Sequence, residues 1–136
     1  MAPAHPGLTE ADVIARGGWH PRYARVLAAA SDGDYGFAVV DGNGDGAELE
    51  AELWMWDEGA WTSGTSSGTG QLDFLASFQA GGEPGEICFA YGRAPGRGSV
   101  TISYDGRLHD VPASRHGIWA FIGASPTAGE FPRLVP

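Results

Sequence analysis

The sequence contains no lysine, a single cysteine and no long apolar run, and each of these absences excludes a class of function. All eight basic residues are arginines, so Schiff-base chemistry and a phosphate-binding P-loop lysine are excluded. Cys88 has no second cysteine with which to form an intramolecular disulfide. No stretch approaches the ~18 apolar residues of a membrane span, and the N-terminal residues lack the pattern of a signal peptide. We therefore expect a cytoplasmic protein with no membrane partner.

Positive charge is scarce in the whole chain. Seventeen acidic residues stand against eight basic ones, which gives a formal net charge of −9. We therefore expect no nucleic-acid partner, because the neutralisation of phosphates needs a positive surface. The 136 residues amount to one domain, and an apolar fraction of 43% is enough to close a core. The 22 glycines and 9 prolines favour many turns over long helices.

The first third of the chain predicts one or two short helices. Thr9 and Asp12 have the spacing of a capping box, which predicts a helix over Glu10–Arg16. Pro21 fits the first turn of a second helix. That helix would cover residues 22–30, with Val26 and Leu27 on its buried stripe.

From Tyr35 onward the apolar pattern becomes that of short strands. Tyr35–Asp41 is an apolar run typical of a buried strand, and residues 47–56 alternate with a period of two. The Thr/Ser/Gly-rich residues 62–71 are expected to be a flexible loop, and residues 72–78 fit either a helix or a strand. Four further strands are predicted at Glu86–Gly92, Ser99–Tyr104, Arg107–Val111 and Gly117–Ile122.

About seven short strands with turns between them predict a mainly β fold, an antiparallel β-sandwich preceded by one or two short helices. The expected domain 1–136 consists of a loose tail (1–8), a helical segment (9–30), the β-sandwich (35–122) and a C-terminal tail (123–136).

The acidic residues concentrate in one stretch. Residues 32–58 contain nine acidic residues and no basic one, whereas residues 91–136 contain five arginines and three acids, a net charge of about 5 − 3 = +2. Two interpretations remain open: a solvated strand face that aids solubility, or a docking surface for a basic partner or a cation. The residues of the docking surface would be Glu48, Glu50, Glu52, Trp54, Trp56, Asp57 and Trp61.

The tryptophans of this stretch have two interpretations as well. The alternation places Trp54 and Trp56 on the same strand face as the glutamates. If the indoles are exposed, they form a stacking platform or an anchor for a partner. If they are buried, they form a second core face of the strand.

Residues 41–46, followed by Glu52, fit the calcium-loop pattern D-x-[DN]-x-[DN]-G-x5-E. Ca2+ takes six to eight oxygen ligands, and Asp41, Asn43 and Asp45 are the candidate ligands, with Glu48 as a further one. Two features oppose this assignment: a glutamate occupies the normally aliphatic eighth position, and the flanking segments are predicted to be strands. The alternative is an Asp/Asn/Gly-rich hairpin turn.

Catalytic patterns are few. Residues 64–68 match G-x-S-x-G, yet they lie in a stretch expected to be a loop. His109 and His116 could act as a base or as metal ligands, but His109 and its neighbour Asp110 point to opposite faces of a strand. An enzyme that uses His109 or His116 therefore ranks behind an interaction module and a Ca2+-stabilised domain.

The closing part of the chain resembles a known group of proteins. The pattern consists of Ile87–Arg93, Ala94-Pro95-Gly96, Ser99–Gly106, Val111-Pro112 and Gly117–Phe121. It resembles the closing strands of small, mostly uncharacterised actinobacterial β-sandwich proteins, over about residues 35–122. The resemblance implies a fold and supplies no catalytic residue. We therefore expect a non-enzymatic acidic module that docks a basic partner through the hairpin 41–58.

Overall fold

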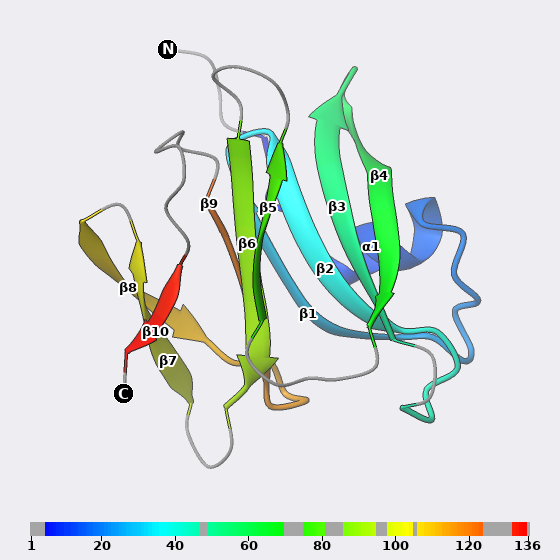
Figure 1. The fold of residues 1–136 in the computed structure, drawn as a ribbon. Helices are drawn as coiled ribbons and strands as arrows, with labels where there is room; N and C mark the ends of the chain where they lie inside the picture. The colour runs from blue at the N-terminus through cyan, green and yellow to red at the C-terminus, as the bar shows by residue number, and fades with distance from the viewer. Residues whose placement is uncertain are drawn as a thin grey trace.

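The computed structural model describes residues 5–46, 49–69, 75–80, 86–94, 98–104, 106–123 and 132–135. These residues form one short helix and ten strands (Figure 1). In chain order they are α1 (Glu10–Arg16), β1 (Arg25–Asp32), β2 (Tyr35–Asp41), β3 (Leu49–Asp57), β4 (Ala60–Thr69), β5 (Leu75–Ala80), β6 (Glu86–Arg93), β7 (Ser99–Tyr104), β8 (Arg107–Pro112), β9 (Ile118–Gly123) and β10 (Arg133–Val135).

The strands pair in three sheets, and every described pairing is antiparallel. Sheet A has the order β1-β2-β3-β4, sheet B has the order β5-β6-β9, and sheet C has the order β10-β7-β8. The predicted mainly β, antiparallel fold class is confirmed at this level. The strands described are more numerous than the seven expected, and they form three sheets instead of the two of a sandwich.

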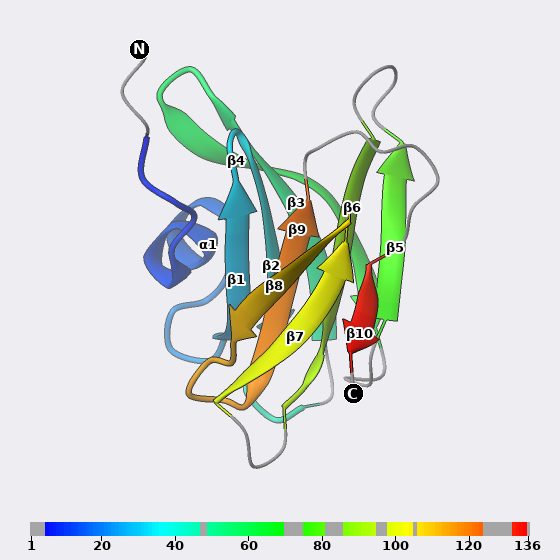
Figure 2. The same cartoon turned by 90° about the vertical axis from the view of Figure 1, so that its left-hand side faces the viewer.

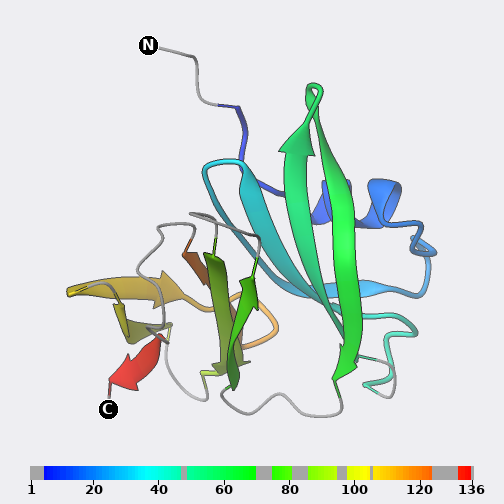
Figure 3. The same cartoon turned by 45° about the horizontal axis from the view of Figure 1, so that its top comes forward.

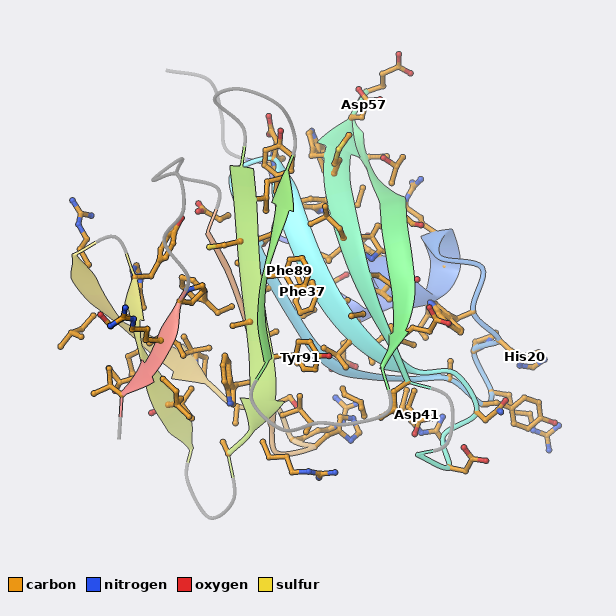
Figure 4. All side chains as sticks on the ribbon, in the orientation of Figure 1. His20, Phe37, Asp41, Asp57, Phe89 and Tyr91 are labelled. Carbon is orange, nitrogen blue, oxygen red and sulfur yellow. The ribbon has the colours of Figure 1, made fainter. Side chains whose placement is uncertain are left out.

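The elements are stacked in layers, with α1 outside sheet A and with sheet C beyond sheet B (Figures 1 and 2). One apolar cluster joins sheets A and B, where the ring of Phe37 stacks on that of Phe89 with 4.5 Å between centroids (Figure 4). A second cluster lies between sheet A and the N-terminal segment, and a third lies between sheets B and C.

The strands β2, β6 and β9 are buried on both faces along most of their length. In β2, Phe37 and Val39 face sheet B, whereas Ala38 and Val40 face the N-terminal segment. In β6 and β9 the side chains alternate in the same way, one set facing sheet A and the other facing sheet C. A strand covered on both sides has no polar face, so these segments are continuous apolar runs in the sequence.

The helix α1 has the predicted bounds and cap. The Oγ1 atom of Thr9 accepts a hydrogen bond from the Asp12 backbone N–H at 3.1 Å, and the Asp12 carboxylate accepts one from the Thr9 N–H at 3.0 Å. Arg115, in the β8–β9 loop, donates two hydrogen bonds of 3.1 Å to the Glu10 carboxylate. Val13 is fully buried against sheet A. The helix is therefore held in place by its N-terminal cap, by the packing of Val13 and by the ion pair between Glu10 and Arg115.

The second predicted helix, over residues 22–30, is wrong. Its residues contribute instead to β1, which pairs with β2. Val26 and Leu27, expected on one helical stripe, point to opposite faces of sheet A, one under α1 and the other toward sheet B. The alanines of this segment favour a helix locally, but pairing with an apolar neighbour buries both faces of a strand and outweighs that preference.

Several segments expected to be irregular belong to the folded structure. The predicted loop 62–71 is strand as far as Thr69, and the undecided segment 72–78 contributes to β5. In the predicted tail 1–8, Leu8 is buried. In the predicted tail 123–136, residues 133–135 pair with β7 as β10. The remaining parts of these segments (1–4, 70–74, 124–131 and 136) lie outside the described residues.

Candidate functional site

The glutamate and tryptophan face of β3 is largely internal, because the N-terminal segment with α1 covers this side of sheet A (Figure 3). Glu52 is 4% exposed and Trp54 is 0% exposed. Trp61, on the neighbouring β4, is 2% exposed. The predicted docking surface therefore loses Glu52, Trp54 and Trp61 as exposed residues, and Glu48 lies outside the described residues.

Glu52 is held by two indoles in this buried layer. Its Oε1 atom accepts hydrogen bonds from Trp19 Nε1 at 3.2 Å and from Trp54 Nε1 at 3.3 Å. Burial raises the pKa of Glu52 above its ordinary value, the two indole hydrogen bonds offset part of that rise, and the nearby charge of Glu50 adds to it. The face of β3 on which glutamates and tryptophans alternate thus contains both the buried carboxylate of Glu52 and one of its hydrogen-bond donors, the indole of Trp54.

The loop after β2 is organised around Asp41, which is buried. Its Oδ1 atom accepts the Gly44 N–H at 2.9 Å, and its Oδ2 atom accepts the Gly46 N–H at 2.8 Å. Both glycines have positive φ, of 75° and 79°, which is typical of the turn interpretation.

Glu52 does not belong to this loop, contrary to the calcium pattern. The β2–β3 register pairs Asp41 with Leu49 and Ala38 with Glu52, which places Glu52 three pairs along the ladder. No group of three or more acidic, histidine or cysteine side chains that could share a metal is found among the described residues, which do not include Glu48. Calcium binding through Asp41, Asn43 and Asp45 stays a prediction.

The opposite end of sheet A carries exposed acids (Figure 4). We call it the acidic end; it comprises the β1–β2 turn and the tip of the β3–β4 hairpin, with the exposed residues Asp32, Asp34, Asp57 and Glu58. The backbone N–H of Trp56 donates to the Asp34 carbonyl at 2.7 Å and fixes the turn against the hairpin. Met55, beside the tip, is 44% exposed. Acidic and apolar groups therefore share one accessible surface.

His5 lies at the acidic end between two indoles. Its ring stacks on Trp56 with centroids 4.3 Å apart and an interplanar angle of 7°, and it meets Trp61 edge-on at 5.3 Å and 84°. The Nε2 atom lies 2.8 Å from Asp34 Oδ1, and the Nδ1 atom lies 3.0 Å from the carbonyl oxygen of Pro6. Both nitrogens face acceptors, which suits the doubly protonated imidazolium.

These contacts raise the pKa of His5 above its ordinary value. The hydrogen bond to the Pro6 carbonyl contributes most, followed by the one to Asp34. Sequence reasoning missed this residue because it lies in a segment predicted to be a tail. The sequence offers only a weak indication of this site, because His5 is isolated and the two tryptophans it contacts lie more than fifty positions further along the chain.

The strands β1, β8 and β9 lie close to one another (Figure 2). Residues of these strands line a cavity of about 360 Å3. Each of these strands is the edge of its own sheet. The ionisable and aromatic residues of the lining are Asp32, Tyr104, Arg107, His109, Asp110 and Phe121. The His109 ring lies 5.1 Å from that of Phe121, and its Nε2 atom lies 3.4 Å from the Tyr104 carbonyl oxygen. The cavity therefore places an imidazole near two carboxylates and a guanidinium.

The other candidate catalytic residues lie elsewhere. His116 is in the β8–β9 loop and is not part of the cavity lining; its Nε2 atom is buried without a hydrogen-bond partner among the described residues. Residues 64–68, the G-x-S-x-G match, lie within β4 and do not form a strand-to-helix turn. Of the two candidate histidines, His109 is therefore the one that lines this cavity.

Comparison with protein-family models, with curated proteins and with solved structures finds no match for this chain. The resemblance to actinobacterial β-sandwich proteins accordingly stays a prediction. No helix in the described part of the chain has the length and apolar character needed to cross a membrane.

Proposed function

We propose that this chain is a cytoplasmic, non-enzymatic interaction module that docks a basic partner at the acidic end of sheet A. The proposal keeps the acidic hairpin as the binding element and moves the contact from the face of β3 to its tip. One observation carries it: the acids of the tip and of the adjacent turn face solvent, whereas Asp41 and Glu52 are buried and bonded internally.

The chemistry of the acidic end suits such a partner. Asp34, Asp57 and Glu58 concentrate negative charge, which steers an oppositely charged partner and sets its orientation. Met55 and the half-buried Trp56 add apolar surface of the kind that forms anchors in interfaces.

The test is an isothermal calorimetric titration of the protein with a capped nona-arginine peptide. The double substitution Asp57→Asn/Glu58→Gln is expected to weaken binding about fivefold, because each exposed ion pair contributes up to ~1 kcal/mol. The control is Asp45→Asn/Glu50→Gln, which removes the same charge from positions toward the other end of sheet A. Equal losses in the two double variants would mean that only net charge matters and would overturn the proposal.

A second candidate function is favoured by the cavity beside β8. His109 lines the cavity together with Asp32 and Asp110, and its imidazole could act as a general acid or base on a small polar molecule. The test is to titrate the protein with small amines, carboxylates and amino acids and to record the backbone amide chemical shifts by NMR at each step. A bound molecule is expected to shift residues 30–32, 107–112 and 120–123. Shifts confined to the tip of the β3–β4 hairpin would reject this candidate.

A further inference from the structure

The aromatic pair Trp56 and Trp61 surrounds His5 as a cage surrounds a cation. The two indoles are nearly perpendicular, at 77° with centroids 5.6 Å apart. One presents its face to the imidazole and the other meets it edge-on. Asp34 supplies a carboxylate at one ring nitrogen. Two aromatic walls and one carboxylate are the components with which proteins bind organic cations.

The occupant of the cage comes from the chain itself. Pro6 accepts hydrogen bonds through its carbonyl oxygen from both His5 Nδ1 and Trp61 Nε1, the latter at 3.1 Å. Leu8, two positions further on, is buried against the same cluster. The segment that carries His5 thus covers Trp61 and leaves it 2% exposed.

The contacts of His5 match those that an arginine side chain makes. A guanidinium is planar, stacks on aromatic faces and donates parallel N–H groups to a carboxylate. The nearly parallel stack on Trp56 and the short contact to Asp34 are the same two interactions. A lysine ammonium lacks the plane and gains less from the stack.

We propose that Trp56, Trp61 and Asp34 form a cage for an arginine side chain of the basic partner, and that His5 occupies this cage until the arginine displaces it. This inference rests on the proposed function and names the group that the acidic end recognises. It also makes docking dependent on pH. Among the described residues, Asp34 is the charged group in contact with His5, and the remaining neighbours are the indoles and the Pro6 carbonyl. Loss of the imidazolium proton weakens the internal occupant and leaves the incoming guanidinium charged.

The probe is a capped Gly-Arg-Gly tripeptide, with the citrulline tripeptide as its uncharged isostere. Binding to the full chain is monitored by NMR through the indole Nε1–H signals of Trp56 and Trp61. His5→Ala is expected to strengthen binding of the arginine peptide about tenfold, because a single cation–aromatic contact with a carboxylate contributes on that order. In the wild-type protein, affinity is expected to increase as the pH rises through the titration of His5.

Two substitutions provide the matched comparison. Asp34→Asn and Asp57→Asn remove the same charge from the acidic end, but only Asp34 contacts the occupant of the cage. Both are made in the His5→Ala background, where no internal occupant shares the Asp34 contact. There, Asp34→Asn is expected to lower affinity about tenfold, and Asp57→Asn, which removes only charge near the cage, about twofold. Trp56→Ala is expected to reduce the difference between the arginine and citrulline peptides but not to abolish it, because the cation–aromatic contact is lost while the carboxylate of Asp34 remains.

The outcomes separate the cage from the broader function. If nona-arginine binds at the acidic end but the His5 and Trp56 substitutions leave its affinity unchanged, the cage inference is wrong and the proposed function stands. If His5→Ala binds the arginine tripeptide while wild-type protein binds no basic peptide, the cage stands and the proposed function fails. Equal binding of the citrulline peptide would also overturn the cage.

Discussion

At the scale of single residues, the chain places two carboxylates of its acidic stretch in buried positions and gives each a pair of N–H donors. Asp41 receives two backbone amides and Glu52 receives two indoles. A buried carboxylate without such donors destabilises a fold by several kcal/mol. Both residues therefore have structural roles that their acidity alone does not reveal.

Glu52 makes stability depend on pH. Its pKa is raised in the folded protein, so the folded state binds more protons than the unfolded state as the pH rises above the ordinary value of 4.5. The free energy of unfolding of the wild type is therefore expected to fall, relative to that of Glu52→Gln, as the pH rises from about 4.5 through the raised pKa of the folded state. Urea unfolding across this range measures the difference.

Two further variants provide the controls for Glu52. Glu52→Ala removes the acceptor of two indole N–H groups and is expected to cost about 1–3 kcal/mol. Glu58→Gln makes the same chemical change at an exposed position. If Glu52→Gln and Glu58→Gln shift the pH curve equally, Glu52 does not have the assigned effect.

Asp41→Ala is expected to lower the free energy of unfolding by about 1–3 kcal/mol, because the Gly44 and Gly46 amides lose their acceptor. The turn interpretation predicts the same thermal midpoint with 1 mM Ca2+ and with excess chelator. The calcium interpretation predicts that Ca2+ raises the midpoint of the wild type by several degrees but not that of the variant, since a ligand of the native state adds about 2.7 kcal/mol at 100 times its Kd. Thermal unfolding of both proteins decides between the two.

At the scale of elements, the N-terminal segment seals the outer face of sheet A. Gly36 in β2 leaves room for it: a Cβ atom at this position would lie 2.9 Å from Leu8 Cδ2 and 3.3 Å from the Trp61 ring. Gly36→Val is therefore expected to destabilise the protein by about 1–3 kcal/mol through overpacking. The amides of residues 8–16 should lose their protection against hydrogen exchange.

Gly98→Val is the control for this substitution, because among the described residues, its chain neighbours aside, no heavy atom lies within 4 Å of a Cβ atom built there. It is expected to leave the exchange of residues 8–16 unchanged. Faster exchange throughout the protein in Gly36→Val, with no preference for the N-terminal segment, would contradict the role given to that segment.

The sequence predicts elements well where local signals and packing agree. The capping box at Thr9 fixes the start of α1, and the period-two pattern identifies β3, whose Leu49, Ala51 and Leu53 face sheet B as expected. Met55 has the same phase but is exposed, because it lies close to the hairpin tip. The alanine-rich β1 could not be predicted, since only its pairing with β2 decides its conformation.

The candidate site was less accessible to sequence reasoning than the fold. The alternation on β3 correctly grouped Trp54 with Glu52, but nothing local shows that Trp19 donates to the same carboxylate from 33 positions away. The same holds for His5, whose partners come from the β1–β2 turn, β3 and β4. Such sites depend on contacts between distant segments, which composition and periodicity do not encode.

At the scale of the whole molecule, the net charge of −9 places the folded state under self-repulsion. Raising NaCl from about 10 mM to 0.5 M shortens the screening length from about 30 Å to under 5 Å. The thermal midpoint is therefore expected to rise by a few degrees, with a smaller rise in Asp57→Asn/Glu58→Gln. Calorimetry at each salt concentration measures it. A midpoint that falls with salt would show that attractive ion pairs, such as Arg115 with Glu10, outweigh the repulsion.

The layered arrangement has a consequence for any form of the protein that has lost its first sixteen residues. Sheet A would then present Val26, Val40 and Trp54, which the intact chain buries in the cluster beneath α1, to water. The strands beneath would remain closed by sheet B on their other side. An apolar face of this kind marks a surface for association. Proteolysis near the N-terminus would therefore yield a folded protein that aggregates through one defined face.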